Sequence, residues 1–221
     1  MTPEITAHIA NLGKYSAGTL TDAVLTFPTT TEQVQAALRS IGVDGLRYEE
    51  IIITEYAASV PGLAAVLGEH AHLDELNYLA ARLNALPPEE REVFAAAVRH
   101  GEYAGSMQDL INLTYNLDCY ELYPEVKTYE DYGRLLVDTG RDFTLSENAR
   151  YYVDFAQYGE ETAINEGGEL TPQGYIFNNR SPGREVYDGK NIPWQHRVFR
   201  YPIQAKIRER PPERISGKLT R

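Results

Sequence analysis

The spacing of the apolar residues changes near residue 60, and this change restricts the fold of the 221-residue chain more than any other feature. Before that point, apolar residues alternate with polar ones or form short runs, as in residues 4–11, 20–27 and 50–56. Such patterns are typical of β-strands. Beyond it, leucines recur every three or four residues, at Leu73, Leu76, Leu79, Leu83 and Leu86. This spacing predicts an amphipathic helix, so a sheet unit comes before a helical unit.

Helix start and stop signals fill in both units. Thr29–Thr31 supply N-cap candidates, and Gly42 is a natural end for the helix that they open. Residues 13–18, which begin and end with glycine, predict a loop between the first two strands. After the interruption at Pro87 and Pro88, further helices are expected over 89–100 and from Ser106 to about 117.

The remaining chain mixes both kinds of signal. We expect a strand over 119–123, a helix from Thr128 to about Asp138, a helical stretch from Ser146 to about Asn165 and a hairpin over 169–177. Residues beyond 178 are weakly periodic and predict an irregular segment. The fold class is therefore α+β, with three small domains at 1–60, 61–117 and 118–203 and a basic tail at 204–221.

Charge is distributed unevenly along the chain. The formal net charge is −11, but residues 1–170 hold 28 acidic and 10 basic residues, a net of −18. Residues 171–221 hold 4 acidic and 11 basic residues, a net of +7. An acidic body repels nucleic acid and attracts proteins with basic grooves. The alternative interpretation of so acidic a surface is plain solubility.

Motifs that carry chemistry are missing from the sequence. It contains no phosphate-binding loop, no G-x-S-x-G and no H-E-x-x-H. Only His70 and His72 lie close together among five histidines, which is a weak metal signal, and Cys119 is better explained as a small buried hydrophobe. We therefore expect no catalytic residue, no metal and no cofactor. A hydrolase that uses paired carboxylates remains an alternative without a supporting motif.

The chain also lacks the signals of a membrane or secreted protein. No apolar run approaches the roughly 20 residues that a membrane helix needs, and the first residues do not resemble a secretory signal. We expect a cytoplasmic protein that binds neither membrane nor, directly, nucleic acid.

Several blocks of sequence, in order, resemble one known family. They are ITAHIANLGKYSAGTL, TFPTT, LGEHAHLDELNYLAARL, QDLINLTYNLDCYELYP, DYGRLLVDTG, RYYVDFAQYGEET and GGELTPQGYIF, within residues 4–178. The chain resembles the ArdA antirestriction proteins, which mobile genetic elements carry. The resemblance implies a non-enzymatic inhibitor that binds type I restriction–modification enzymes in place of duplex DNA. It also implies an elongated rod of three domains that dimerises through the last one.

Mimicry of DNA requires carboxylates along a long surface. The candidates for partner binding are Glu69, Asp74, Glu75, Glu89, Glu90, Glu92, Glu102, Asp109, Asp118, Glu121, Glu125, Glu130, Asp131 and Asp138. For about half of them, a helix cap or a solvated helix face is the better explanation. The alternative function with the same composition is a regulatory protein of a mobile element that binds another basic, DNA-binding partner.

The sequence is also rich in tyrosine, with 16 in all, many of them between residues 115 and 158. Core packing with solvated hydroxyls or a subunit interface explains such a cluster. For the homodimer that the resemblance implies, the candidate interface residues are Tyr151, Tyr152, Phe155 and Tyr158. Near the C-terminus, apolar side chains predict that the chain before residue 204 packs on the body, and these are Trp194, Val198, Phe199, Tyr201 and Ile203.

Overall fold

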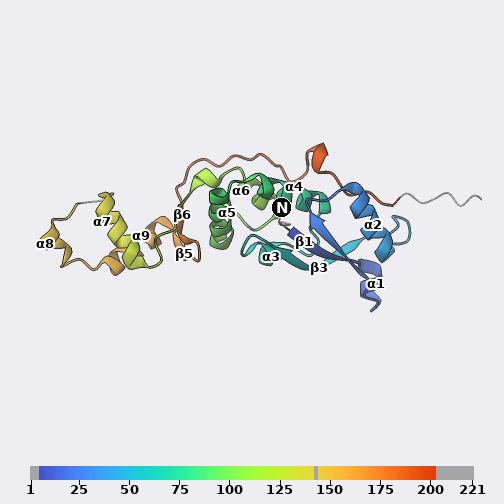
Figure 1. The fold of residues 1–221 in the computed structure, drawn as a ribbon, viewed down its shortest axis with the longest axis horizontal. Coiled ribbons are helices and arrows are strands. Elements are labelled where there is room, and N and C mark those ends of the chain that lie inside the picture. Colours follow the sequence, from blue (N-terminus) through green and yellow to red (C-terminus); the bar gives the residue numbers. More distant parts are fainter. Residues whose placement is uncertain (1–4, 142–143, 203–221) are drawn as a thin grey trace, which may run out of the picture.

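The computed structural model describes residues 5–141 and 144–202, and over these residues the fold is α+β. Figure 1 shows the elements following one another along one long axis, with α2 near one end and α8 at the other. Two small antiparallel sheets are present, with strand orders β2-β1-β3 and β4-β6-β5. The strands are β1 (Ile5–Asn11), β2 (Asp22–Phe27), β3 (Ile51–Ala58), β4 (Tyr120–Tyr123), β5 (Glu169–Thr171) and β6 (Gly174–Asn178).

Nine α-helices lie within the described residues. They are α1 (Leu12–Ser16), α2 (Thr31–Ile41), α3 (Leu63–Val66), α4 (Leu73–Ala85), α5 (Pro88–His100), α6 (Met107–Leu113), α7 (Tyr129–Thr139), α8 (Glu147–Arg150) and α9 (Phe155–Glu166). Two short 3₁₀ turns, η1 (Leu117–Cys119) and η2 (Trp194–His196), complete the set. None of these helices combines the length and apolar character that a bilayer crossing requires.

The first sheet confirms the three strands expected before residue 60. β1 is its central strand and pairs antiparallel with both neighbours, with Ile5 opposite Phe27 and Ala58. α2 packs against this sheet, and its ends match the sequence signals. Thr30 and Gln33 form a capping box at its start, and Gly42 ends it in the left-handed conformation at φ 76°.

The loop expected over residues 13–18 is in part wrong, because α1 occupies most of it. The Asn11 side chain accepts a hydrogen bond from the backbone N–H of Lys14 and so starts one helical turn. The backbone turns after α1 at Gly18, where φ is 79°. A turn this short has no apolar periodicity for sequence reasoning to find.

The central helices confirm the helical unit, with two changes at the ends. Pro88 occupies the first turn of α5, where a missing N–H costs nothing, so the prolines begin this helix as well as interrupt the chain. α6 ends at Leu113 instead of near 117. Beyond it, the Thr114 hydroxyl and the Asn116 amide donate to carbonyls of α6, which competes with helix continuation.

The last helical stretch, expected as one piece from 146 to 165, is divided into α8 and α9. The Asp154 carboxylate accepts a hydrogen bond from the backbone N–H of Gln157 and starts a new helix. α9 then crosses α7 at a contact between two glycines. A Cβ on Gly133 would lie 2.0 Å from the Phe155 carbonyl oxygen, so the two backbones approach closely because glycine stands there.

The buried side chains form two separate clusters. The larger, here called the main core, joins the first sheet to the central helices and includes Ile5, Leu38, Leu79, Phe94 and Ile111. The smaller, here called the C-terminal core, consists of Val126, Tyr132, Leu136, Ala163, Tyr175 and Phe177. The tyrosines buried in the second cluster confirm core packing as one reason for the abundance of tyrosine.

Residues 179–202, here called the strap, run back from β6 along the central helices towards α2 (Figure 1). Hydrogen bonds fasten the strap along its course: the side-chain oxygen of Asn112 accepts from the backbone N–H of Tyr187, and the Gln35 side chain donates to the Tyr201 carbonyl oxygen. Apart from η2 the strap is irregular, as expected. Val198 is buried, as the packing prediction requires, but Trp194 is 83% exposed, and for that residue the prediction is wrong. Ile203 and the basic tail at 204–221 lie outside the described residues.

Candidate partner-binding surface

Three of the fourteen candidate carboxylates are occupied with holding the fold together. Asp74 is only 8% exposed, and its Oδ1 accepts hydrogen bonds of 2.6 Å from the backbone N–H groups of both Val198 and Phe199. Glu75 is half-buried and accepts from the Tyr187 hydroxyl at 2.9 Å. Asp109 is half-buried and accepts from the hydroxyl of the N-cap residue Ser106 at 2.7 Å. These three side chains anchor the strap or cap α6.

Four further candidates are exposed but neutralised by an arginine. Glu102 pairs with Arg180 at 2.7 Å and Asp118 with Arg184 at 2.5 Å, so the strap supplies both of these cations. The other two pairs, Glu130 with Arg134 and Asp138 with Arg150, lie within the C-terminal part. Exposed pairs of this kind add little stability, and a competing cation can replace the arginine.

The remaining seven candidates are exposed and form no ion pair with a lysine or arginine of the described residues. They are Glu69, Glu89, Glu90, Glu92, Glu121, Glu125 and Asp131. Asp131 also closes the capping box at the start of α7, where it accepts hydrogen bonds from the Thr128 side chain and from the backbone N–H of Lys127, so it stabilises the helix as well as presenting a charge. These bonds lower the pKa of its carboxyl group, so it is ionised at neutral pH.

The start of α5 gathers three of these free carboxylates in little more than one turn. Glu89, Glu90 and Glu92 are all exposed there, at the positive end of the helix. Arg91, which lies between Glu90 and Glu92 in the sequence, donates to the carbonyl oxygens of Leu86 at 3.0 Å and Asn84 at 3.1 Å. The first turns of the helix present three carboxylates to solvent.

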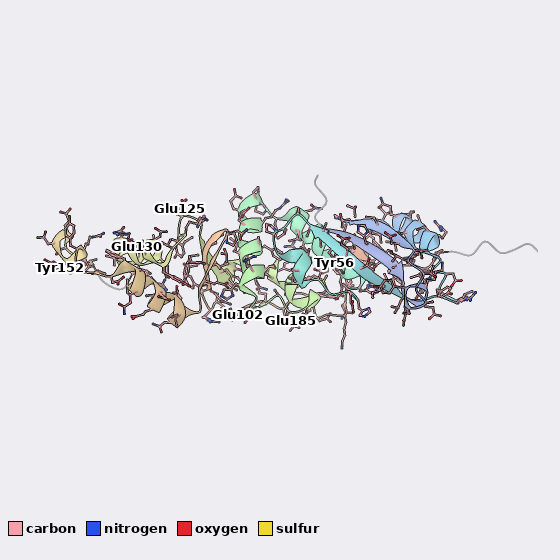
Figure 2. The ribbon with its side chains drawn as sticks, turned by 90° about the horizontal axis from the view of Figure 1, so that it is seen from below. Tyr56, Glu102, Glu125, Glu130, Tyr152 and Glu185 are labelled. Atoms are coloured by element: carbon pink, nitrogen blue, oxygen red, sulfur yellow. The ribbon has the colours of Figure 1, made fainter. Side chains whose placement is uncertain are left out.

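The carboxylates do not fall on a single line. Figure 2 shows Glu125 at one edge of the molecule and Glu102 and Glu185 at the opposite edge. Exposed acids that were not among the candidates extend the negative surface further, including Glu160 and Glu161 on α9 and Glu169 on β5. Glu160 and Glu161 are adjacent in the sequence, and this doubling of acidic residues is the signal that could have identified them.

The aromatic candidates for an interface separate into two kinds. Tyr151 and Tyr152, which follow α8, are 87% and 91% exposed, and Figure 2 shows Tyr152 at one end of the molecule. Phe155 is buried, with the Arg134 guanidinium 4.6 Å from its ring centre, and Tyr158 is half-buried. The two tyrosines that follow α8 are thus available for contact with a partner.

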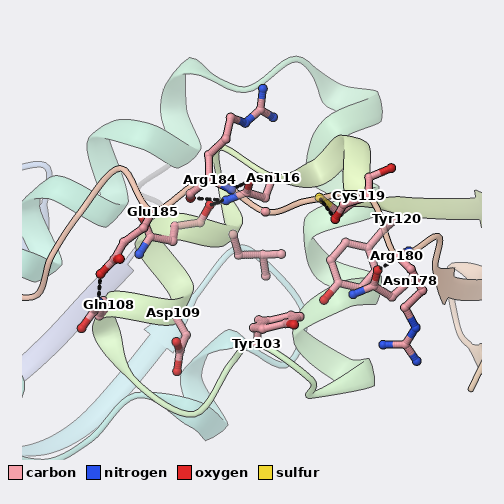
Figure 3. A pocket seen from close by; sticks show the side chains of 14 residues that line it. Tyr103, Gln108, Asp109, Asn116, Cys119, Tyr120, Asn178, Arg180, Arg184 and Glu185 are labelled. Carbon is pink, nitrogen blue, oxygen red and sulfur yellow. Dashed lines mark hydrogen bonds between the residues drawn. The ribbon is translucent and has the colours of Figure 1, made fainter.

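A cavity of about 480 Å³ lies between α6, β4 and the start of the strap (Figure 3). Cys119 lines it but is buried, and its thiol lies 3.5 Å from the Ser181 carbonyl oxygen. Burial and the neighbouring Asp118 raise the pKa of this thiol, against the opposing effect of Arg184. A protonated, buried thiol is a poor nucleophile. Among the described residues, no group of three or more His, Cys, Asp and Glu side chains is placed to hold a metal ion.

Comparison with protein families gives the surface a context. The family model described as "Antirestriction protein (ArdA)" matches residues 7–177, which is well over half of the chain and ends where the strap begins. A search of curated proteins finds no match to the chain. The chain therefore belongs to the ArdA family of antirestriction proteins, which are non-enzymatic inhibitors of type I restriction–modification enzymes.

Proposed function

We propose that this antirestriction protein inhibits its target by presenting exposed carboxylates as an acidic mimic of duplex DNA. The observation that carries the proposal is the set of seven exposed carboxylates that no lysine or arginine of the described residues neutralises. Glu102, Asp118, Glu130 and Asp138 would join them if the enzyme's cations replace the arginines that they contact. Asp74, Glu75 and Asp109 are assigned to the fold instead.

The physical basis is the way in which restriction enzymes hold DNA. Duplex DNA carries about one negative charge per 1.7 Å of its axis, and a DNA-binding enzyme grips these phosphates with lysine and arginine. Phosphate contacts carry no sequence information, since base edges are read separately. A protein that imitates the phosphates alone therefore inhibits enzymes that recognise different sequences.

Arrangement and assembly are part of the same proposal. We propose an elongated chain of three small units, the first two of which share the main core, and a homodimer with Tyr151 and Tyr152 at the interface and Phe155 and Tyr158 behind it. The order of elements along the long axis in Figure 1 supports the elongated arrangement. The exposure of the two tyrosines supports the interface, because aromatic side chains at an exposed tip are typical of contact surfaces. Light scattering at high micromolar concentration tests the dimer, and a monomer would refute it.

The α5 carboxylates offer the sharpest test of mimicry. In a DNA-cleavage assay with a purified type I enzyme, the triple variant Glu89→Gln, Glu90→Gln, Glu92→Gln should need about tenfold more inhibitor, at roughly 0.5 kcal/mol for each exposed charge contact. The matched control is Glu32→Gln, Glu147→Gln, Glu185→Gln, which removes the same charge from three separate exposed sites. Equal losses in the two variants would show that net charge matters and not this surface.

Salt gives a second and independent test. Because the enzyme would release the counterions of its cationic groove, binding should weaken steeply as salt increases. A complex that is indifferent to ionic strength would contradict mimicry, even if the protein inhibits cleavage.

A further inference from the structure

The two halves of the strap use their cations differently. In the first half, Arg180 and Arg184 point to the body and pair with Glu102 and Asp118. In the second half, Lys190, Arg197 and Arg200 are exposed and form no ion pair with a carboxylate of the described residues. The outer half of the strap thus offers three cations without a carboxylate partner on a molecule that is otherwise acidic, although Arg197 Nε also donates to the Ile192 carbonyl oxygen at 2.8 Å.

Trp194, the only tryptophan of the chain, lies between these cations and is held away from the body. Ile192 and Val198 are buried on either side of it. The His196 ring stacks on Tyr78 at 4.6 Å, and the Asn77 amide donates to the His196 carbonyl oxygen at 3.2 Å. The chain is therefore fastened before and after Trp194, while the indole itself is 83% exposed.

We propose that the outer half of the strap, residues 190–200, binds single-stranded nucleic acid. Exposed lysine and arginine neutralise phosphates, and an exposed aromatic ring stacks on an unpaired base whatever its identity. A duplex hides the faces of its bases and would leave the indole without a partner. An acidic peptide would satisfy the cations but offers the indole no stacking surface.

The acidic body limits the strength of this binding without preventing it. At physiological salt, charges more than about 8 Å away are largely screened, so the local cations dominate at the strap. The sequence after residue 202 contains six basic residues and two acidic ones, so the positive charge of the strap continues along the sequence. The proposal is independent of DNA mimicry, and it revises for the strap alone the expectation that the chain does not bind nucleic acid directly.

The test uses the full-length chain and its single tryptophan as the probe. Titration with a short oligothymidylate at physiological salt, where the acidic body is screened, should quench the Trp194 fluorescence to a plateau, and raising the salt further should reverse the quenching. Anisotropy of a labelled oligothymidylate measures affinity in parallel. The triple variant Lys190→Gln, Arg197→Gln, Arg200→Gln should bind at least about tenfold more weakly, and Trp194→Ala about fivefold more weakly, at 1 kcal/mol or more for a stacked base.

Controls separate this proposal from general charge effects and from the inhibitory function. Arg39→Gln with Arg99→Gln removes two exposed arginines of α2 and α5 and should change the affinity less than twofold. The strap variants should inhibit the restriction enzyme like the unaltered protein. Absence of quenching at saturating oligothymidylate, or equal binding by the triple variant, would overturn the proposal. Equal quenching by polyglutamate would also overturn it and would indicate an acidic protein partner.

Discussion

The main core and the C-terminal core differ in the types of side chain that they bury. The main core is large and mainly aliphatic, with Leu38, Leu79 and Ile111 fully buried, although it also holds aromatic side chains such as Phe94 and Tyr78. The C-terminal core is small, and its largest members are Tyr132 and Tyr175, whose rings stack at 3.9 Å. Both hydroxyls donate to Glu166, and Arg141 pairs with the same carboxylate at 2.7 Å.

This difference indicates how each part resists unfolding. Aliphatic burial contributes free energy that depends little on direction or pH. The tyrosine–glutamate–arginine network contributes only while each donor finds its acceptor and each charge keeps its state. The C-terminal part should therefore be the less stable of the two and the more sensitive to pH.

The largest expected effect comes from opening the main core. Leu79→Ala should lower the free energy of unfolding by about 4 kcal/mol, because it removes a fully buried side chain and leaves a cavity. Since one core joins the first sheet to the central helices, hydrogen exchange should accelerate in β1–β3 and α4–α6 together. The control is Val66→Ala, which truncates a partly exposed side chain. Acceleration confined to α4 would show that sheet and helices are energetically separate.

The second-largest expected effect is a loss of stability in the C-terminal part. A Cβ on residue 159 would lie 1.9 Å from the Tyr129 carbonyl oxygen, so Gly159→Ala must push α9 away from α7. Overpacking at this contact should cost about 3 kcal/mol. The control is Gly68→Ala, whose added methyl group meets no atom within 4 Å. Hydrogen exchange should accelerate in α7 and α9 only, and equal melting of both variants would contradict the close contact.

The sequence was sufficient to predict local structure in both regions. Thr30 and Gly42 mark the ends of α2, and Thr128 and Gly140 mark those of α7, because caps act within a few residues. The same locality explains the errors. A five-residue helix such as α1 has no periodicity to detect, and the break before α9 depends on one aspartate among several.

Contacts over long sequence separations were beyond such reasoning. Asp74 stands in the first turn of α4, where an acid is expected for the helix end alone, yet it binds the backbone of residues 198 and 199. No local signal reports that the strap returns to α4. For the same reason, the sequence identified which carboxylates exist but not that Glu102 and Asp118 are paired with arginines of the strap.

The third effect is about 2 kcal/mol and tests the polar network. Tyr132→Phe removes a hydroxyl that donates to Glu166 and accepts from Arg141 at 2.8 Å, and hydrogen bonds to charged groups are worth about 1.5–3 kcal/mol. Chemical denaturation followed by exchange in α7 and α9 measures the loss. Tyr15→Phe, at an exposed tyrosine of α1, is the control and should change nothing.

The pH dependence of the same network has a definite sign. Burial and the Glu166 carboxylate raise the pKa values of Tyr132 and Tyr175 above the ordinary value near 10. The network therefore contributes fully below pH 10, and its contribution falls as the pH rises above 10, because the unfolded chain then loses protons that the folded chain retains. Tyr132→Phe should make the C-terminal part less sensitive to alkali. A variant as sensitive as the unaltered protein would assign the alkaline loss to other tyrosines.

The smallest effect uses a feature that the two regions share. α2 and α7 each begin with a capping box, formed by Thr30 with Gln33 and by Thr128 with Asp131. Thr30→Ala and Thr128→Ala should each remove about 1 kcal/mol, since each leaves a backbone N–H without its side-chain acceptor. The local loss is the same, but α2 packs on the main core and α7 on the smaller C-terminal core. Thr128→Ala should therefore raise the unfolded fraction of its own region to a higher level than Thr30→Ala does.

Local hydrogen-exchange rates in α2 and α7, measured on both variants, test this expectation. Ser146→Ala, at the N-cap of the four-residue α8, serves as a reference for a weaker cap. If the two threonine variants expose their regions to the same extent, the two cores are equally stable, and the stacked tyrosines with their shared carboxylate stabilise the C-terminal part as much as aliphatic burial stabilises the rest.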